Sequence, residues 1–153
     1  MPPYYSITTD PSSFDYERIH DFLSRQSYWA RGIPMDVMKK SIKNSLSFSI
    51  FYEEEQVGFA RVVTDYATFA WLGDVFIDEG HRGKGLGKWL METIHKHPDV
   101  QGLRRWILAT SDAHGLYQKW GYTPLAKPGI YMERYEPEIY RKASSINPDA
   151  DAE

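Results

Sequence analysis

The sequence predicts one domain of the α/β (α+β) fold class, in which a mixed central β-sheet carries helices on both faces. Two observations lead to this prediction. The spacing of apolar residues changes from helical to strand-like near residue 47, and the chain from 47 to 63 then indicates an antiparallel hairpin. Further on, a nearly all-apolar strand, an amphipathic helix and a second apolar strand follow one another. Such a crossover usually joins parallel neighbours, so the sheet is expected to be mixed.

The first part of the chain supplies one strand and two helices. Residues 4–8 are a short strand candidate, and turn and cap residues at 10–13 introduce a helix with Ile19, Phe22 and Leu23 at helical spacing. A second helix is expected after Pro34. The aromatic segment between the helices has no period and is expected to be a loop.

The remaining elements follow from the same patterns. Strands are expected at 47–52, 56–63, 68–77 and 104–111, and helices at 86–97, ended by Pro98, and at 114–120, ended by Gly121. Two short strands are expected at 123–125 and 130–135. The predicted order is β-α-α-β-β-β-α-β-α-β-β.

Length and composition fit one folded unit. The chain has 153 residues with 42% hydrophobic and 15% aromatic side chains, enough for a core in a single domain. We expect a domain at 1–136 and a C-terminal extension at 137–153. The end of this extension is polar and acidic, and is therefore expected to be disordered.

Composition also excludes several functions. The chain has no cysteine, which excludes disulfides, thiolate metal sites and a cysteine nucleophile. The net charge of −3 argues against nucleic-acid binding. His95 and His97 are two residues apart and would point to different helix faces, so no metal is expected. The chain has neither a leader-like start nor an apolar run long enough to span a membrane, and a cytoplasmic location is expected.

The most informative segment is HRGKGLGKW at 81–89, where a buried strand ends and a helix begins. A helix N-terminus offers unpaired N–H groups and partial positive charge, and glycines let a ligand approach the backbone closely. Arg82, Lys84 and Lys88 add charge. The segment therefore predicts a phosphate or pyrophosphate site. It matches neither the Walker pattern nor the dinucleotide pattern G-x-G-x-x-G, since its glycines are at 83, 85 and 87.

The segment resembles a known family. Arg82-x-x-Gly85-x-Gly87 matches the [QR]-x-x-G-x-[GA] motif of the GCN5-related N-acetyltransferases (GNAT). About 30 residues later, AHGLYQKWGY at 113–122 resembles the family's A-x-x-L-Y-x-x-x-G-[FY] signature. The resemblance is close over 47–135, and it implies a GNAT-like fold and an acyltransferase that uses acetyl-CoA as co-substrate.

The resemblance also implies the cofactor contacts. Backbone groups of Val75, Phe76 and Ile77 would pair with pantetheine, between two central strands that splay apart. Backbone N–H groups of the loop would hold the pyrophosphate; its residues are Arg82, Gly83, Lys84, Gly85, Leu86, Gly87 and Lys88. Many members have Asn three residues before Ala113, where this chain has Thr110. That pantetheine contact is therefore either lost or replaced by the hydroxyl.

Two residues are catalytic candidates. The resemblance implies that Tyr117 stands near the sulfur of the cofactor, and a tyrosine hydroxyl is protonated at neutral pH and can act as a general acid. The alternative for Tyr117 is a half-buried tyrosine that packs the short helix. Asp74 lies in an apolar strand, where a carboxylate is costly unless it is paired or used. It is either the base, acting directly or through water, or an acceptor of structural hydrogen bonds near Gly73. Asp65 and Glu79 are expected to be turn residues.

The acceptor and the partners are less defined by sequence. Tyr28, Trp29, Tyr66 and Trp71 are candidate walls of the acceptor site, because aromatic faces beside a carboxylate suit an ammonium group. The main hypothesis is acetyl transfer to a small primary amine. Alternatives are a protein N-terminus or lysine as acceptor, a CoA-binding sensor without catalysis, and a nucleotide-binding module. Exposed strands near the C-terminus could pair in a homodimer, and no nucleic-acid or membrane partner is expected.

Overall fold

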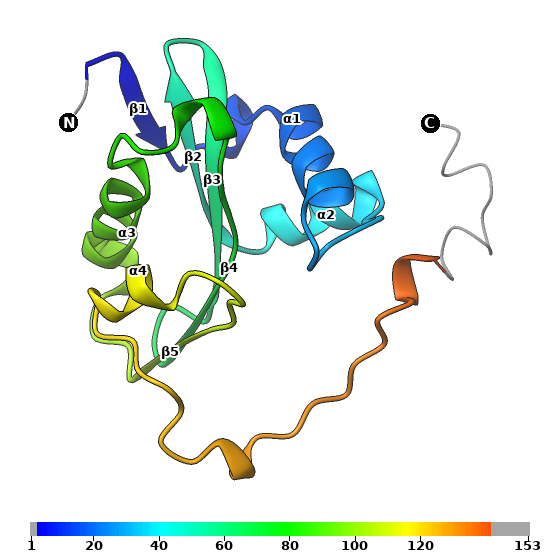
Figure 1. Ribbon diagram of the computed structural model, residues 1–153, viewed down its shortest axis with the longest axis vertical. Coiled ribbons are helices and arrows are strands. Elements are labelled where there is room, and N and C mark those ends of the chain that lie inside the picture. Colours follow the sequence, from blue (N-terminus) through cyan, green and yellow to red (C-terminus); the bar gives the residue numbers. More distant parts are fainter. Residues whose placement is uncertain (1–2, 142–153) are drawn as a thin grey trace.

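The structure, a computed structural model, describes residues 3–141 and contains one five-stranded sheet (Figure 1). Its strands are β1 (Tyr5–Thr8), β2 (Leu46–Tyr52), β3 (Glu55–Thr64), β4 (Phe69–Ile77) and β5 (Arg105–Leu108). They lie in the order β1-β2-β3-β4-β5, with antiparallel pairing up to β4 and parallel pairing of β4 with β5. The mixed sheet predicted from the sequence is confirmed.

Helices cover both faces of this sheet, as predicted (Figure 1). One face carries α1 (Tyr16–Asp21), which continues into a π-helical turn (Phe22–Gln26), and α2 (Met35–Lys43). The other face carries α3 (Leu86–Lys96) and α4 (His114–Gln118). Helix α4 ends at Gln118, two residues before the end at residue 120 that the sequence predicts.

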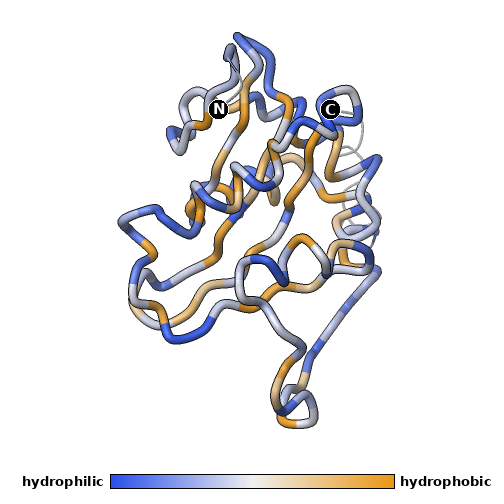
Figure 2. Tube along the Cα trace, turned by 60° about the vertical axis from the view of Figure 1, so that its left-hand side comes forward, coloured by the Kyte–Doolittle hydropathy of each residue, from blue (hydrophilic) through white to orange (hydrophobic). Residues whose placement is uncertain are grey.

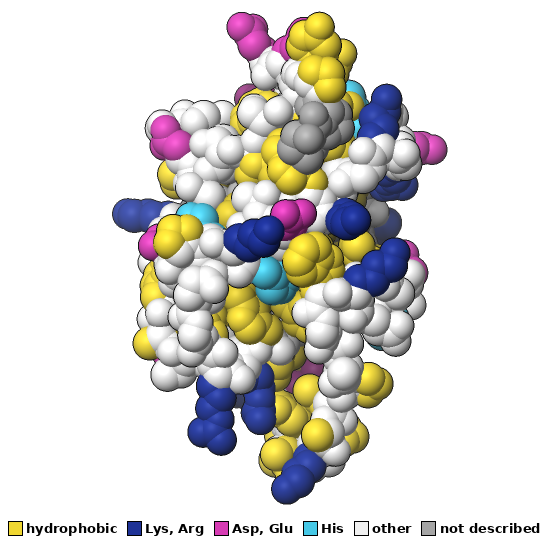
Figure 3. All heavy atoms as spheres, turned by 90° about the vertical axis from the view of Figure 1, so that its left-hand side faces the viewer, with side chains coloured by type: hydrophobic (Ala, Val, Ile, Leu, Met, Phe, Trp, Pro, Cys, Tyr) yellow, Lys and Arg dark blue, Asp and Glu magenta, His cyan; other side chains and the backbone are white. Residues whose placement is uncertain are grey.

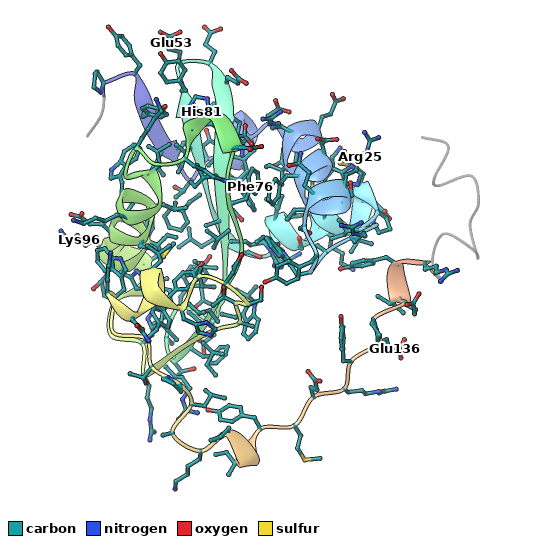
Figure 4. The ribbon with its side chains drawn as sticks, viewed as in Figure 1. Arg25, Glu53, Phe76, His81, Lys96 and Glu136 are labelled. Carbon is teal, nitrogen blue, oxygen red and sulfur yellow. The ribbon has the colours of Figure 1, made fainter. Side chains whose placement is uncertain are left out.

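Each face has its own core because strand side chains alternate between the faces. Phe48 and Ile50 of β2 are fully buried on the α3 side. Phe59 and Phe76 are buried on the α1 side, and Figure 4 labels Phe76 between the sheet and α1. Phe76 stacks on Phe22 with ring centroids 4.0 Å apart. In Figure 2, where the Cα trace is coloured by residue hydropathy, much of the inner strands is accordingly hydrophobic. Two packed layers thus hold the central strands from both sides.

The two short C-terminal strands predicted at 123–125 and 130–135 do not form, and that prediction is wrong. Residues 123–137 instead make an extended arm with a single 3-10 turn (Pro128–Ile130). Proline lacks an N–H donor, and Pro124 and Pro128 interrupt the pairing that the apolar residues would favour. Beyond the arm, Tyr140 packs against the α1 side of the core.

The domain boundary expected at residue 136 stays a prediction, and the end of the expected extension lies outside the described residues. Within the described residues, no helix is both long and apolar enough to cross a membrane. Across 3–141, no group of three or more His, Asp or Glu side chains could hold a metal ion.

Candidate active site

A β-bulge in β4 forms the centre of the candidate site. Phe59 pairs with Phe76 and Arg61 with Gly73, so Ala60 of β3 faces two residues, Asp74 and Val75. Asp74 has a φ of 55°, in the left-handed region that few residues other than glycine adopt. A bulge bends its strand and redirects a side chain, and such features occur often beside active sites.

Beside the bulge, β4 and β5 separate. Their pairing ends at Leu72 with Leu108, before the bulge is reached. A cavity of about 580 Å³ lies at this point. Its lining comes from the α1–α2 loop, α2, β3, β4, the segment after β5, α4 and the end of the arm; it includes Tyr28, Trp29, Arg61, Trp71, Asp74, Val75, Thr110, Ala113, Tyr117 and Tyr140.

Asp74 is held on both sides in this cavity. Arg61 Nε donates to its Oδ2 over 2.7 Å, and Trp29 Nε1 donates to its Oδ1 over 2.9 Å. The Asp74 side chain is only 11% exposed. The carboxylate therefore has a fixed orientation, and each oxygen keeps a further lone pair for a ligand. The structural role that the sequence left open for Asp74 is present, and it leaves room for a chemical role.

Tyr117 lines the same cavity from α4. Its side chain is 7% exposed, and its hydroxyl makes no hydrogen bond to another described residue. Burial raises the pKa of Tyr117, and the nearby Asp112 and Tyr28 raise it further. The hydroxyl thus keeps its proton at neutral pH and can donate it inside the cavity.

The glycine loop follows β4 and leads into α3, which covers one face of the sheet. Gly83 and Gly85 have φ values of 76° and 80°, and a Cβ at either would meet no atom within 4 Å. The N–H groups from Gly83 to Lys88 make no backbone hydrogen bond among the described residues. Figure 3 shows several basic side chains on the side of the molecule that carries α3. Exposed N–H groups at a helix N-terminus can hold a pyrophosphate.

The side chains of the loop divide between two tasks. Leu86 is 2% exposed and anchors α3 in the core. Arg82 Nε donates to the carbonyl of Ile77 over 2.9 Å, which ties the loop to the end of β4. Lys84 and Lys88 are exposed. Leu86 and Arg82 therefore hold the loop against the core and the end of β4, while Lys84, Lys88 and the unpaired N–H groups stay available to a ligand.

Other candidates from the sequence lie in different settings. Phe76 has a buried side chain and Phe59 as its strand partner, so only its backbone on the β5 side could meet a ligand. The Thr110 hydroxyl accepts from the Ala113 N–H over 3.1 Å and helps to begin α4. Tyr66 lies on the turn between β3 and β4 and does not line the cavity.

Arg61 and Tyr140 are among the lining residues that the sequence analysis missed. Arg61 is the one charged residue inside the apolar run of 56–63, and that isolation was a usable signal. Tyr140 reaches the cavity only because the arm returns to the body of the protein. Asp65 accepts hydrogen bonds from the N–H groups of Ala67 and Thr68, so it is the turn residue that was predicted.

Together the bulge and the separation of β4 from β5 form a cavity, and the glycine loop begins α3. Comparison with known proteins agrees with the family that the sequence resembles. The profile of the acetyltransferase (GNAT) domain matches residues 43–124. A protein of Gibberella zeae described as an acetyltransferase is 31% identical over 137 residues, covering 75% of this chain and 76% of its own. The chain belongs to the GNAT family of acetyltransferases.

Solved structures give the same result. A GNAT-family protein from Xanthomonas campestris pv. campestris has a TM-score of 0.87 at 51% identity, covering 90% of this chain and 97% of that one. An acetyltransferase from Deinococcus radiodurans R1 has a TM-score of 0.70 at 14% identity, covering 89% and 91%, and supports the fold alone.

Proposed function

We propose that this protein transfers an acetyl group from acetyl-CoA to the primary amine of a small molecule. The amine attacks the thioester directly in a ternary complex. The observation that carries the proposal is that Asp74 and Tyr117 line one cavity at the point where β4 and β5 separate. A fixed carboxylate and a protonated hydroxyl are the two groups that this reaction needs. The expected cytoplasmic location remains part of the proposal.

The loop and the separated strands would position the co-substrate. The outward N–H groups from Gly83 to Lys88, with Lys84 and Lys88 beside them, suit a pyrophosphate. The β4 backbone at Val75 to Ile77 has β3 on one side and no β5 partner on the other. That free side can pair with the amide groups of the pantetheine arm, which would place its thioester in the cavity.

Asp74 and Tyr117 would then move the protons. Asp74 attracts the acceptor ammonium and takes its proton, directly or through water. The amine nitrogen bonds to the thioester carbonyl carbon and releases its second proton to water, the carbon–sulfur bond breaks, and Tyr117 donates its proton to the departing sulfur. Tyr117 recovers a proton from solvent. Positioned acid and base groups contribute about 10²–10⁴-fold each.

The aromatic walls favour a small acceptor. Tyr28 and Trp29 meet edge to face with centroids 5.0 Å apart, and Trp71 lines the same cavity. About 580 Å³ is within the range of small-molecule sites. Aromatic faces beside a carboxylate would hold an amine with an apolar body.

Calorimetric titration with acetyl-CoA, and with CoA and ATP as controls, tests the co-substrate. We expect acetyl-CoA to bind with micromolar affinity or tighter and ATP not to bind. Thiol release would then be followed over a panel of small amines and a lysine peptide, without protein background since the chain has no cysteine. Acetyl-CoA that fails to bind would overturn the proposal.

Tyr117→Phe separates an enzyme from a CoA sensor. We expect turnover to fall by about 100-fold or more and acetyl-CoA affinity to stay within twofold. Tyr66→Phe is the matched control, because Tyr66 is exposed and outside the cavity. Unchanged turnover in Tyr117→Phe would remove Tyr117 from the mechanism.

A further inference from the structure

A second hollow shares a wall with the cavity that Asp74 and Tyr117 line. This hollow has a volume of about 510 Å³, and Tyr28, Trp29 and Tyr140 line both spaces. The indole N–H of Trp29 donates to Asp74 over 2.9 Å, so the carboxylate lies beside this shared wall. A ligand whose amine meets Asp74 can therefore extend along the aromatic side chains toward the hollow.

The hollow contains two arginines whose charge is not neutralised by a neighbour. Arg31 lies on the α1–α2 loop, Arg134 lies on the arm, and both are exposed. Neither guanidinium forms an ion pair or hydrogen bond with another residue of 3–141. The loop and the chain beyond the arm meet here, because a Cβ at Gly32 would lie 4.0 Å from that of Tyr140. Two separate segments thus bring positive charge to one place.

The charges of the two spaces have opposite sign. The lining of the cavity has two carboxylates, Asp74 and Asp112, against one arginine, Arg61. The lining of the hollow has two arginines against one carboxylate, that of Glu136. A guanidinium offers a planar set of N–H donors that fits a carboxylate or a phosphate, often through two parallel hydrogen bonds. The pair of spaces therefore suits a ligand that is cationic at one end and anionic at the other.

We propose that the acceptor is an amine that carries an anionic group, a carboxylate or a phosphate, at its far end. Its amine would lie at Asp74, its body along Tyr28 and Trp29, and its anion at Arg31 and Arg134. This inference rests on the proposed function, because it names the class of acceptor that the same site takes.

A series of matched acceptors tests this class. Thiol release would be measured with ω-aminocarboxylates of increasing chain length, with ω-aminoalkyl phosphates, and with the uncharged ω-amino amides of the same lengths. At the best length, we expect the KM of one anionic acceptor to be lower than that of its amide by about tenfold or more. The carboxylate and phosphate series show which anion the hollow prefers. Equal KM values for the anions and the amides at every length would overturn the inference.

Arginine variants locate the preference in the hollow. Arg31→Gln and Arg134→Gln should each raise the KM of the anionic acceptor by about tenfold and change that of the matched amide far less. Arg104→Gln is the control, because Arg104 is likewise exposed but lines neither space. Circular dichroism would verify that each variant is folded. An anion preference that survives in both folded variants would place the anion elsewhere and overturn the inference.

The two proposals fail in different ways. If amides and anions release thiol with equal KM, acetyl transfer stands and the anion site falls. If no amine releases thiol, the proposed function falls. Calorimetric titration with the same carboxylate, phosphate and amide sets needs no turnover and still tests the hollow. We expect the anionic compound to bind about tenfold more tightly than its amide, and equal affinities would overturn the anion site.

Discussion

Arg61 Nε donates to Asp74 Oδ2 over 2.7 Å, and both side chains line the cavity where β4 and β5 separate. Asp74→Asn removes the charge of this carboxylate while keeping its shape, and asparagine tolerates the left-handed φ of 55°. We expect turnover to fall by about 10²-fold or more, measured by thiol release at saturating acetyl-CoA. Acetyl-CoA affinity should change little.

The control for this change is Asp21→Asn, which removes an ion-paired carboxylate on α1 outside the cavity. It should leave turnover as it is. If Asp74→Asn and Asp21→Asn turned over equally well, Asp74 would have only its structural role at the bulge.

Arg61 is expected to act through Asp74. Arg61→Gln leaves the carboxylate without its cationic partner, and the loss of a hydrogen bond between charged groups destabilises by about 1.5–3 kcal/mol. Thermal unfolding should show this loss. Arg61→Lys should recover part of the stability, because the charge remains while the Nε geometry does not. Equal melting temperatures for Arg61→Gln and the parent chain would contradict a stabilising ion pair.

The raised pKa of Tyr117 predicts the alkaline side of the pH profile. A general acid loses activity as the pH rises through its pKa, and the unperturbed value is about 10. Burial, together with Asp112 and Tyr28, raises the pKa of Tyr117 above that value. We therefore expect kcat to show no decline from Tyr117 below about pH 10. A decline centred near pH 8 that disappears in Tyr117→Phe would contradict the raised pKa.

The glycine loop gives a prediction with a matched control. Gly85 and Gly102 have φ values of 80° and 75°, and a Cβ at either meets no atom within 4 Å. Alanine should therefore cost about 1–2 kcal/mol of folding free energy at both positions. Only Gly85→Ala places its methyl group where a pyrophosphate would approach, so acetyl-CoA affinity should fall by roughly tenfold in that variant alone. If calorimetry gave the same acetyl-CoA affinity for Gly85→Ala and Gly102→Ala, the cofactor would not bind at this loop.

Local features could be predicted from the sequence, and distant contacts could not. The loop at 81–89 and the signature at 113–122 are short segments whose residues act together, so their spacing was visible. The bond from Trp29 to Asp74 joins residues 45 apart and depends on how α1 packs on the sheet. The sequence predicts strands in the arm because its apolar residues fit a strand pattern. Whether a strand forms depends on an available edge, which composition does not reveal.

His95 predicts how stability depends on pH. Its Nδ1 lies 2.7 Å from the Met91 carbonyl and donates to it, because a carbonyl oxygen only accepts; in the neutral ring, Nε2 then accepts from the Tyr122 hydroxyl at 2.8 Å. Burial lowers the pKa of His95, partly opposed by the bond to Met91. The unfolded chain then binds a proton at higher pH than the folded one. The stabilisation is therefore present above about pH 6.5 and is lost as the pH falls below it.

Melting temperatures measured from pH 7.5 to 5 test this dependence on His95. The parent chain should lose stability over that range, and His95→Gln should show a shallower dependence. At pH 7.5 the same variant should be less stable by about 1–2 kcal/mol, because its side chain replaces the bonds to Met91 and Tyr122 imperfectly. His114 is exposed, so His114→Gln should keep the parent slope. If the melting temperature of His95→Gln depended on pH as steeply as that of the parent chain, other groups would cause the loss of stability at acidic pH. His95 would then contribute only through packing, since its ring stacks on that of Trp120 with centroids 5.5 Å apart.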